Sequence, residues 1–248
     1  HSRHSQAPAR IEIDFRSRLT RLRQAIAGQE LDGVVSMAPA TIAYLSGFQA
    51  LIYSRPIYLV VDASRTLLIV PGLEEEHAHQ AKGIDETVVY YEHPERGKPG
   101  ENAPDTLAAV LARYGLRRVG IEYPSAPIAL RERLERDGIV TQDVAPAIMR
   151  MRLIKEPGEI ALMRQAATLA RIGVMATLDA AAPGQSQLAI ESVGTNAILE
   201  AAPDITPGAT IHLLQFTTSG PETSLPHLIT TTRRLTRPDL IIHSRQVS

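Results

Sequence analysis

The sequence predicts an α/β domain with a mixed sheet over residues 1–150, followed by an α+β domain over residues 151–248. Three observations carry this prediction. From Asp14 onward, short helical and strand-like patterns alternate at close intervals, which is typical of α/β domains. Near Met149 this alternation gives way to two long helical patterns followed by strand patterns. No internal repeat or low-complexity linker interrupts the 248 residues.

Capping residues and apolar spacing define the elements of the first domain. Asp14 is a suitable N-cap for a helix whose apolar residues recur at spacings of three and four as far as Ile26. Strand patterns at 57–61 and 66–70 flank the polar stretch 62–65, which is typical of a hairpin turn. The other expected strands are 33–37, 87–91, 118–121 and 139–144, and the other expected helices are 41–45, 74–82, 104–114 and 129–136.

The second domain is expected to begin with two helices. Glu156 and Pro157 favour the start of a long helix that ends before Pro183. Its expected core-facing stripe consists of Ile160, Met163, Ala167, Ala170 and Val174. A second helix is expected from about Ser186 to Leu199, and strands are expected over 210–217 and 240–242.

Composition narrows the classes of function. The 26 Lys and Arg residues balance 27 Asp and Glu residues, so the chain lacks the basic surplus typical of nucleic-acid or membrane-surface binding. We therefore expect a small-molecule or short-peptide substrate, with neither nucleic acid nor membrane as a partner. The absence of Cys excludes disulfides and thiolate chemistry within this sequence and fits a cytoplasmic location. No apolar run approaches the roughly 20 residues that span a bilayer.

Two places carry residues suited to catalysis or binding. His227 follows the small-residue turn at 219–221 and precedes a strand pattern, so its imidazole could take a proton from water and return it to a leaving nitrogen. Arg55 could bind a carboxylate through two hydrogen bonds, with Tyr53 as a wall of the pocket. From spacing alone, a surface-loop histidine and a solvated arginine remain alternatives.

Several motifs, in order along the chain, resemble the pita-bread hydrolases, the family of Xaa-Pro aminopeptidases, prolidases and creatinase. They are YLSGF at 44–48, the pair Arg55-Pro56, MRMRLIK at 149–155, and SGP at 219–221 leading to His227. Arg55-Pro56 and the 149–155 stretch look most like creatinase. The resemblance implies a creatinase-type N-terminal α/β domain followed by the first part of an apparently incomplete α+β pita-bread domain.

The resemblance also implies roles for individual residues. A histidine matching His227 is the family's proton-transfer residue. An arginine matching Arg55 in creatinase binds the substrate carboxylate from the neighbouring subunit, which implies a homodimer. Tyr53 would line the substrate pocket, although the matching creatinase residue is phenylalanine.

One departure from the family pattern concerns the metal. Ser244 stands where the metallopeptidase members carry a metal-binding aspartate, and a neutral hydroxyl is a poor ligand for hard divalent ions. Creatinase also lacks this aspartate and works without metal. We therefore expect no metal cofactor, with two divalent ions as the alternative. His243 would point to the opposite face of its strand and is a poor substitute ligand.

The expected function is hydrolysis of a C–N bond in a small carboxylate-bearing substrate by a creatinase-like, metal-independent amidinohydrolase. The alternatives are an Xaa-Pro aminopeptidase or dipeptidase-like metallopeptidase, and a family member that binds without catalysis. We expect the 248 residues alone to be inactive, because the family's further active-site carboxylates would follow Ser248.

Overall fold

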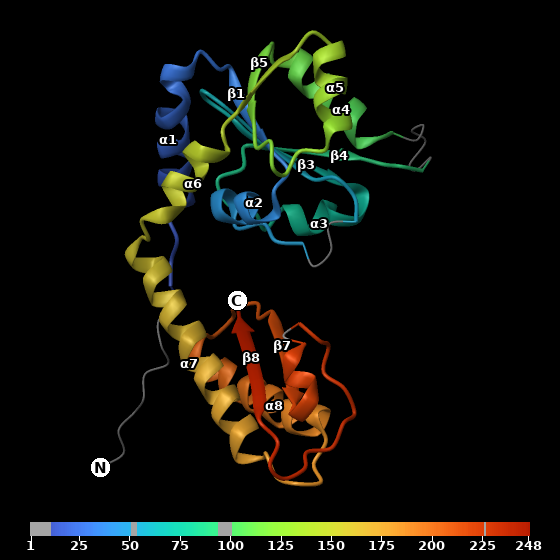
Figure 1. Ribbon diagram of the computed structural model, residues 1–248. Coiled ribbons are helices and arrows are strands. Elements are labelled where there is room, and N and C mark those ends of the chain that lie inside the picture. Colours follow the sequence, from blue (N-terminus) through green and yellow to red (C-terminus); the bar gives the residue numbers. More distant parts are fainter. Residues whose placement is uncertain (1–10, 51–53, 94–100, 226) are drawn as a thin grey trace, which may run out of the picture. The chain divides into compact units, whose positions relative to one another are not determined.

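The computed structural model describes residues 11–50, 54–93, 101–225 and 227–248. It divides into two compact units (Figure 1). The first comprises Asp14–Ile154, and the second comprises residues 155–248 together with 11–13.

A six-stranded mixed sheet forms the centre of the first unit, as predicted. The spatial order of its strands is β4-β3-β2-β1-β5-β6. β2 runs antiparallel to both of its neighbours, and all other pairs are parallel. The carboxyl ends of five strands and the amino end of β2 therefore lie along one edge, called here the carboxyl edge. The strands are β1 (Gly33–Ser36), β2 (Tyr58–Asp62), β3 (Thr66–Pro71), β4 (Glu86–Tyr90), β5 (Arg118–Ile121) and β6 (Val140–Asp143).

Helices cover both faces of this sheet (Figure 1). Alternate strand residues such as Leu59 and Val61 pack with α1, α2 and α6, while Tyr58 and Val60 pack with α4 and α5. The helices are α1 (Phe15–Ile26), α2 (Pro39–Ser46), α3 (Glu75–Ala78), α4 (Ala103–Arg113), α5 (Ile128–Arg136) and α6 (Ala145–Leu153). Within the described residues of the chain, no helix has both the length and the apolar character needed to cross a membrane.

Two aspartates form the helix cap and the hairpin turn that the sequence predicts. The Asp14 carboxylate accepts a hydrogen bond from the Ser17 amide at 3.0 Å and caps α1. The Asp62 carboxylate accepts the backbone amides of Ser64 and Arg65 at 2.7 and 2.6 Å, which closes the β2–β3 hairpin. Both expectations are confirmed.

Two helices of this unit differ from the prediction. The expected helix 74–82 is only α3, preceded by a 3-10 turn at Gly72–Glu74. It stops early because the Lys82 amide bonds instead to the Ser46 carbonyl and Gly83 adopts a positive φ of 68°. α6 was not expected, although Pro146 in its first turn is compatible with a helix start.

Two helices and a two-stranded antiparallel sheet make up most of the second unit. Glu156 and Glu159 form a capping box at the start of the first helix. Of the strands, β8 is longer than the expected 240–242. The elements are α7 (Pro157–Asp179), α8 (Gln187–Ile205), β7 (Leu213–Ser219), a 3-10 turn at Gly220–Ser224 and β8 (Ile241–Val247).

The expected core-facing stripe of α7 is wrong. Ile160 and Met163 are 38% and 56% exposed, whereas the buried positions are Leu169, Gly173 and Thr177. The helix packs along Gly173 and Thr177 because α8 approaches there through its own glycine. A Cβ atom at Gly194 would lie 2.4 Å from the Gly173 carbonyl oxygen. Hydropathy does not mark glycine or threonine as contact residues, so the sequence pattern misplaced the buried face.

Candidate functional site

His227, the proton-transfer candidate, lies exposed in the long connection between β7 and β8. The strand expected directly after it is not formed. Residues 228–240 contain only an isolated bridge between Arg234 and Ser186. Side chains, rather than a continuous ladder of backbone hydrogen bonds, therefore hold much of this segment.

Two polar residues of α8 anchor the segment just after His227. The Thr230 hydroxyl donates to the Glu191 carboxylate at 2.5 Å and accepts the Thr217 amide at 2.8 Å. The Thr231 amide donates to the Gln187 side-chain oxygen at 3.1 Å. Gln187 and Glu191 are four residues apart and share one face of the helix. The position of the His227 loop therefore depends on this helix face.

The same face of α8 contacts β7 through a ladder of polar pairs. Four residues of helix advance about 6 Å and two residues of strand about 6.6 Å, so positions spaced by four on α8 match alternate positions on β7. The three contacts, at 2.9, 3.0 and 3.2 Å, join Gln187 to Ser219, Glu191 to Thr217, and Thr195 to Gln215. We call these six residues the polar ladder.

Arg245 of β8 inserts its guanidinium between α7 and α8. It donates to the Thr177 hydroxyl at 3.3 Å, the Thr195 hydroxyl at 3.1 Å and the Glu191 carbonyl at 3.0 Å. Only 9% of the residue is exposed, and burial lowers the pKa of the guanidinium. An arginine suits this place because its planar fork can donate to acceptors in several directions.

His243 lies on the same side of β8 as Arg245. Its Nδ1 is 2.8 Å from the Thr217 hydroxyl, and Arg245 Nε donates to its Nε2 at 3.4 Å. Burial, and then the charge of Arg245, lower the pKa of this imidazole. His243 therefore belongs to the helix-facing side, as the strand alternation predicts.

Ser244 faces the other way. The face of the β7–β8 sheet opposite α8 carries apolar, hydroxyl and amide side chains, from Leu214, Phe216, Thr218, Ile242, Ser244 and Gln246. Two-metal sites for divalent ions are built mainly from carboxylates, with imidazole as a further ligand, and these six positions provide neither. On this face, β7 and β8 therefore offer no carboxylate or imidazole to a metal ion. Within the described residues, no group of three or more His, Asp or Glu side chains is arranged to hold a metal ion.

In the first unit, Arg55 lies at the carboxyl edge just before β2 and forms an ion pair with Glu92, which follows β4. The hydrogen bond from Nε to the Glu92 carboxylate, and the charge of that carboxylate, raise the pKa of Arg55. Sequence reasoning missed Glu92, because only the pairing of β4 with β3 and of β3 with β2 brings it there. Tyr53 lies outside the described residues, and its role stays a prediction.

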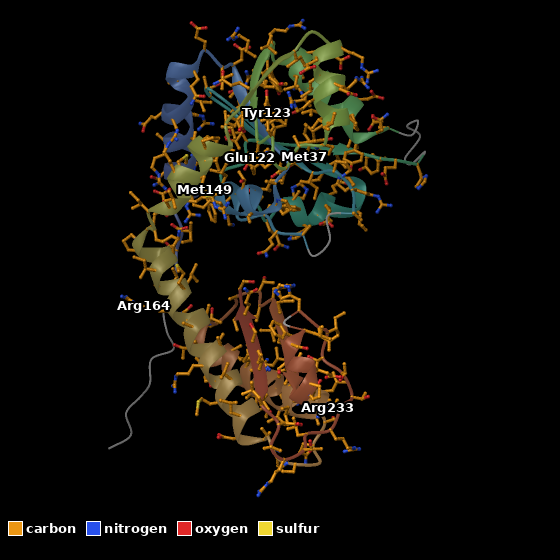
Figure 2. The ribbon with its side chains drawn as sticks, in the orientation of Figure 1. Met37, Glu122, Tyr123, Met149, Arg164 and Arg233 are labelled. Atoms are coloured by element: carbon orange, nitrogen blue, oxygen red, sulfur yellow. The ribbon has the colours of Figure 1, made fainter. Side chains whose placement is uncertain are left out.

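A buried carboxylate lies at the same edge. Glu122, labelled in Figure 2, directly follows β5. It accepts hydrogen bonds from Ser36, at the end of β1, and from Thr41 of α2 at 2.8 Å. Each oxygen thus has a hydroxyl donor, which offsets the cost of burying the charge. Glu122 joins two central strands to the first turn of a helix. A polar residue directly after a buried strand was the signal for it in the sequence.

The comparisons with known proteins agree with this architecture. The creatinase/prolidase N-terminal domain family matches residues 18–154, more than half of the chain. The chain belongs to the creatinase/prolidase family. It is 26% identical to creatinase of Bacillus sp. over 94% of its length, and 25% identical to an uncharacterized hydrolase/peptidase of Sinorhizobium fredii over 71%. These relatives are named as hydrolases, so the chain is a member of an enzyme family.

Solved structures of this family share the fold. The prolidase of Pyrococcus horikoshii superposes with a TM-score of 0.72 at 23% identity, covering 91% of this chain. The X-Pro aminopeptidase of Thermotoga maritima gives 0.73 at 18% identity, also over 91%. The chain spans 59% of each of these structures and 57% and 47% of the two curated relatives. The fold expectation, a creatinase-type domain followed by part of a pita-bread domain, is confirmed.

One prediction concerns an ion pair in the connection between His227 and β8. Arg233, labelled in Figure 2, donates to the Asp239 carboxylate at 2.6 Å. The hydrogen bonds that Asp239 accepts from Arg233 and, next, from Thr236 lower its pKa from 3.8 to about 2. A lowered pKa in the folded state stabilises the protein above the unfolded value, and this contribution is lost as the pH falls through about 2. The difference in melting temperature between wild type and Asp239→Asn should therefore shrink as the pH falls below about 4.

The control is Asp204→Asn, at an exposed position of α8. Its difference from wild type should change little over the same pH range. A difference for Asp239→Asn that stays constant down to the lowest pH at which the protein folds would contradict the assignment.

Proposed function

We propose that this protein is a creatinase-like amidinohydrolase that works without metal as a cytoplasmic homodimer. Ser244 carries the proposal. The motif resemblance aligns it with the metal-binding aspartate of the metallopeptidase members. Its side of the β7–β8 sheet lacks carboxylates and imidazoles at the six positions named above. The polar ladder and Arg245 also support the proposal, because the side chains on the other face of the same strands are occupied by contacts with α8.

The reaction would be attack of water on the amidine carbon of a substrate that also carries a carboxylate. His227 accepts a proton as the water oxygen bonds to carbon, and it returns that proton to the nitrogen as the C–N bond breaks. The exposed position of His227 fits contact with a substrate. One water is consumed. Its oxygen stays on the former amidine carbon in a urea-type product, and the other product is the amine that leaves with the transferred proton.

Arg55 would hold the substrate carboxylate from the neighbouring subunit, with Tyr53 lining the pocket. The partly exposed guanidinium, 39% accessible, supports this role. A planar two-point contact with a carboxylate favours substrates that carry this group over their amides. The homodimer follows from this role of Arg55.

The first test compares substrates and metal dependence in the full-length protein. We expect turnover of creatine that survives exhaustive chelation, because no step depends on a metal. Hydrolysis of a Gly-Pro dipeptide that requires added manganese or cobalt would contradict the proposal in favour of a dipeptidase. Substrate binding without turnover of either compound would favour the non-catalytic alternative.

A second prediction concerns His227. His227→Ala should lower kcat by about two to four orders of magnitude, the usual contribution of general acid–base catalysis, without changing the melting temperature. The matched control is His212→Ala, an exposed histidine just before β7 to which we assign no role. Equal kcat values for the two variants would end the assignment.

A further inference from the structure

The Arg55–Glu92 pair uses only part of the guanidinium. Glu92 accepts the hydrogen bond of Nε. Neither Nη group of Arg55 is hydrogen-bonded to a residue that the structure describes. An arginine can bind a carboxylate through two parallel N–H groups, and the two Nη atoms form one such edge. The pair therefore leaves the edge formed by the two Nη groups available to a ligand, while Nε is held by Glu92.

Both partners are attached to firmly packed residues. The Tyr90 hydroxyl donates to the Pro56 carbonyl at 2.9 Å, next to Arg55, and the Tyr90 residue is completely buried. The Tyr91 hydroxyl donates to Glu75 at 2.7 Å, and Tyr91 directly precedes Glu92. The end of β4 and the residues after it therefore make two contacts beside the pair. Tyr90 binds the backbone of Pro56, and Glu92 binds the side chain of Arg55.

An ion pair on such supports differs from a pair of flexible surface side chains. Holding a long side chain in its bound conformation before the ligand arrives removes part of the entropy cost of binding. Glu92 would compete with a substrate if both used the same edge of the guanidinium. Because Glu92 takes Nε, it can instead fix the direction in which the Nη edge points.

We propose that Glu92 is a positioning residue that holds Arg55 through Nε and presents its two Nη groups to the substrate carboxylate. This inference rests on the proposed function, in which Arg55 binds that carboxylate. It assigns to Glu92 a share of substrate affinity without contact between Glu92 and the reacting atoms.

The test measures steady-state kinetics of the full-length protein with creatine as the substrate. Glu92→Gln should raise KM by about two- to tenfold, which corresponds to ordering one long side chain, and should leave kcat within about twofold. Glu92→Asp keeps the charge and should recover part of the affinity. The matched control, Glu30→Gln, removes a carboxylate 3.7 Å from Arg118 at the opposite edge of the sheet and should leave KM unchanged.

A second readout does not depend on catalysis. Nitrogen-15 relaxation of the Arg55 Nε–H group should show a more ordered side chain in wild type and in Glu30→Gln than in Glu92→Gln. Equal order in all three proteins would overturn the inference, even if no substrate were turned over. An unchanged or lowered KM in Glu92→Gln would overturn it as well, since a lowered value would make Glu92 a competitor.

Arg55→Lys separates failure of this inference from failure of the proposed function. A lysine keeps the charge but cannot form the planar two-point contact, so KM should rise. If Arg55→Lys leaves KM unchanged, Arg55 does not bind the substrate carboxylate and the proposed function of Arg55 fails. If Arg55→Lys raises KM but Glu92→Gln does not, only the positioning role of Glu92 fails.

Discussion

Insertion of the Arg245 guanidinium between α7 and α8 organises residues 155–248. Burying this cation is costly unless its N–H groups find acceptors. Two hydroxyls, a carbonyl, an imidazole and the Gln215 side chain provide them. The two helices can surround it because Gly173 and Gly194 occupy the crossing. The central contact of this unit is therefore made by an arginine and two glycines, which hydropathy does not mark as core residues.

This contact has a direct consequence for chemistry. Side chains alternate along a strand, so fixing Arg245 and His243 toward the helices fixes Ser244 toward the opposite face. The polar ladder then anchors the loop that carries His227 through Glu191 and Gln187. Residues of α8 thus help to fix both the face of β8 that carries Ser244 and the position of the segment that follows His227.

Turns and helix caps, which depend on residues close together in the chain, could be predicted from the sequence. The hairpin at Asp62 and the cap at Asp14 are two such features. The mixed sheet was expected from the alternation of helical and strand patterns, but its strand order, in which β1 pairs with the distant β5, was not. Prediction failed where partners are distant: Glu92 pairs with Arg55 across 37 residues, and Glu122 bonds to Ser36 across 86. The buried face of α7 was misplaced because the crossing consists of Gly and Thr. The strand expected after His227 is not formed, and the segment is held instead by side chains of α8 and by backbone hydrogen bonds to Gln185 and Gln187.

The most direct test of this account is hydrogen exchange at the amides of β7 and β8 in Gly194→Ala. The added Cβ would lie 2.1 Å from the Thr177 hydroxyl, so it must separate the helices around Arg245. Overpacking of this kind costs about 1–3 kcal/mol, and every 1.4 kcal/mol is about a tenfold loss of protection. Asn196→Ala, on the exposed side of α8, provides the control. We expect about tenfold faster exchange in Gly194→Ala than in this control. Equal protection in both variants would contradict the central role of the crossing.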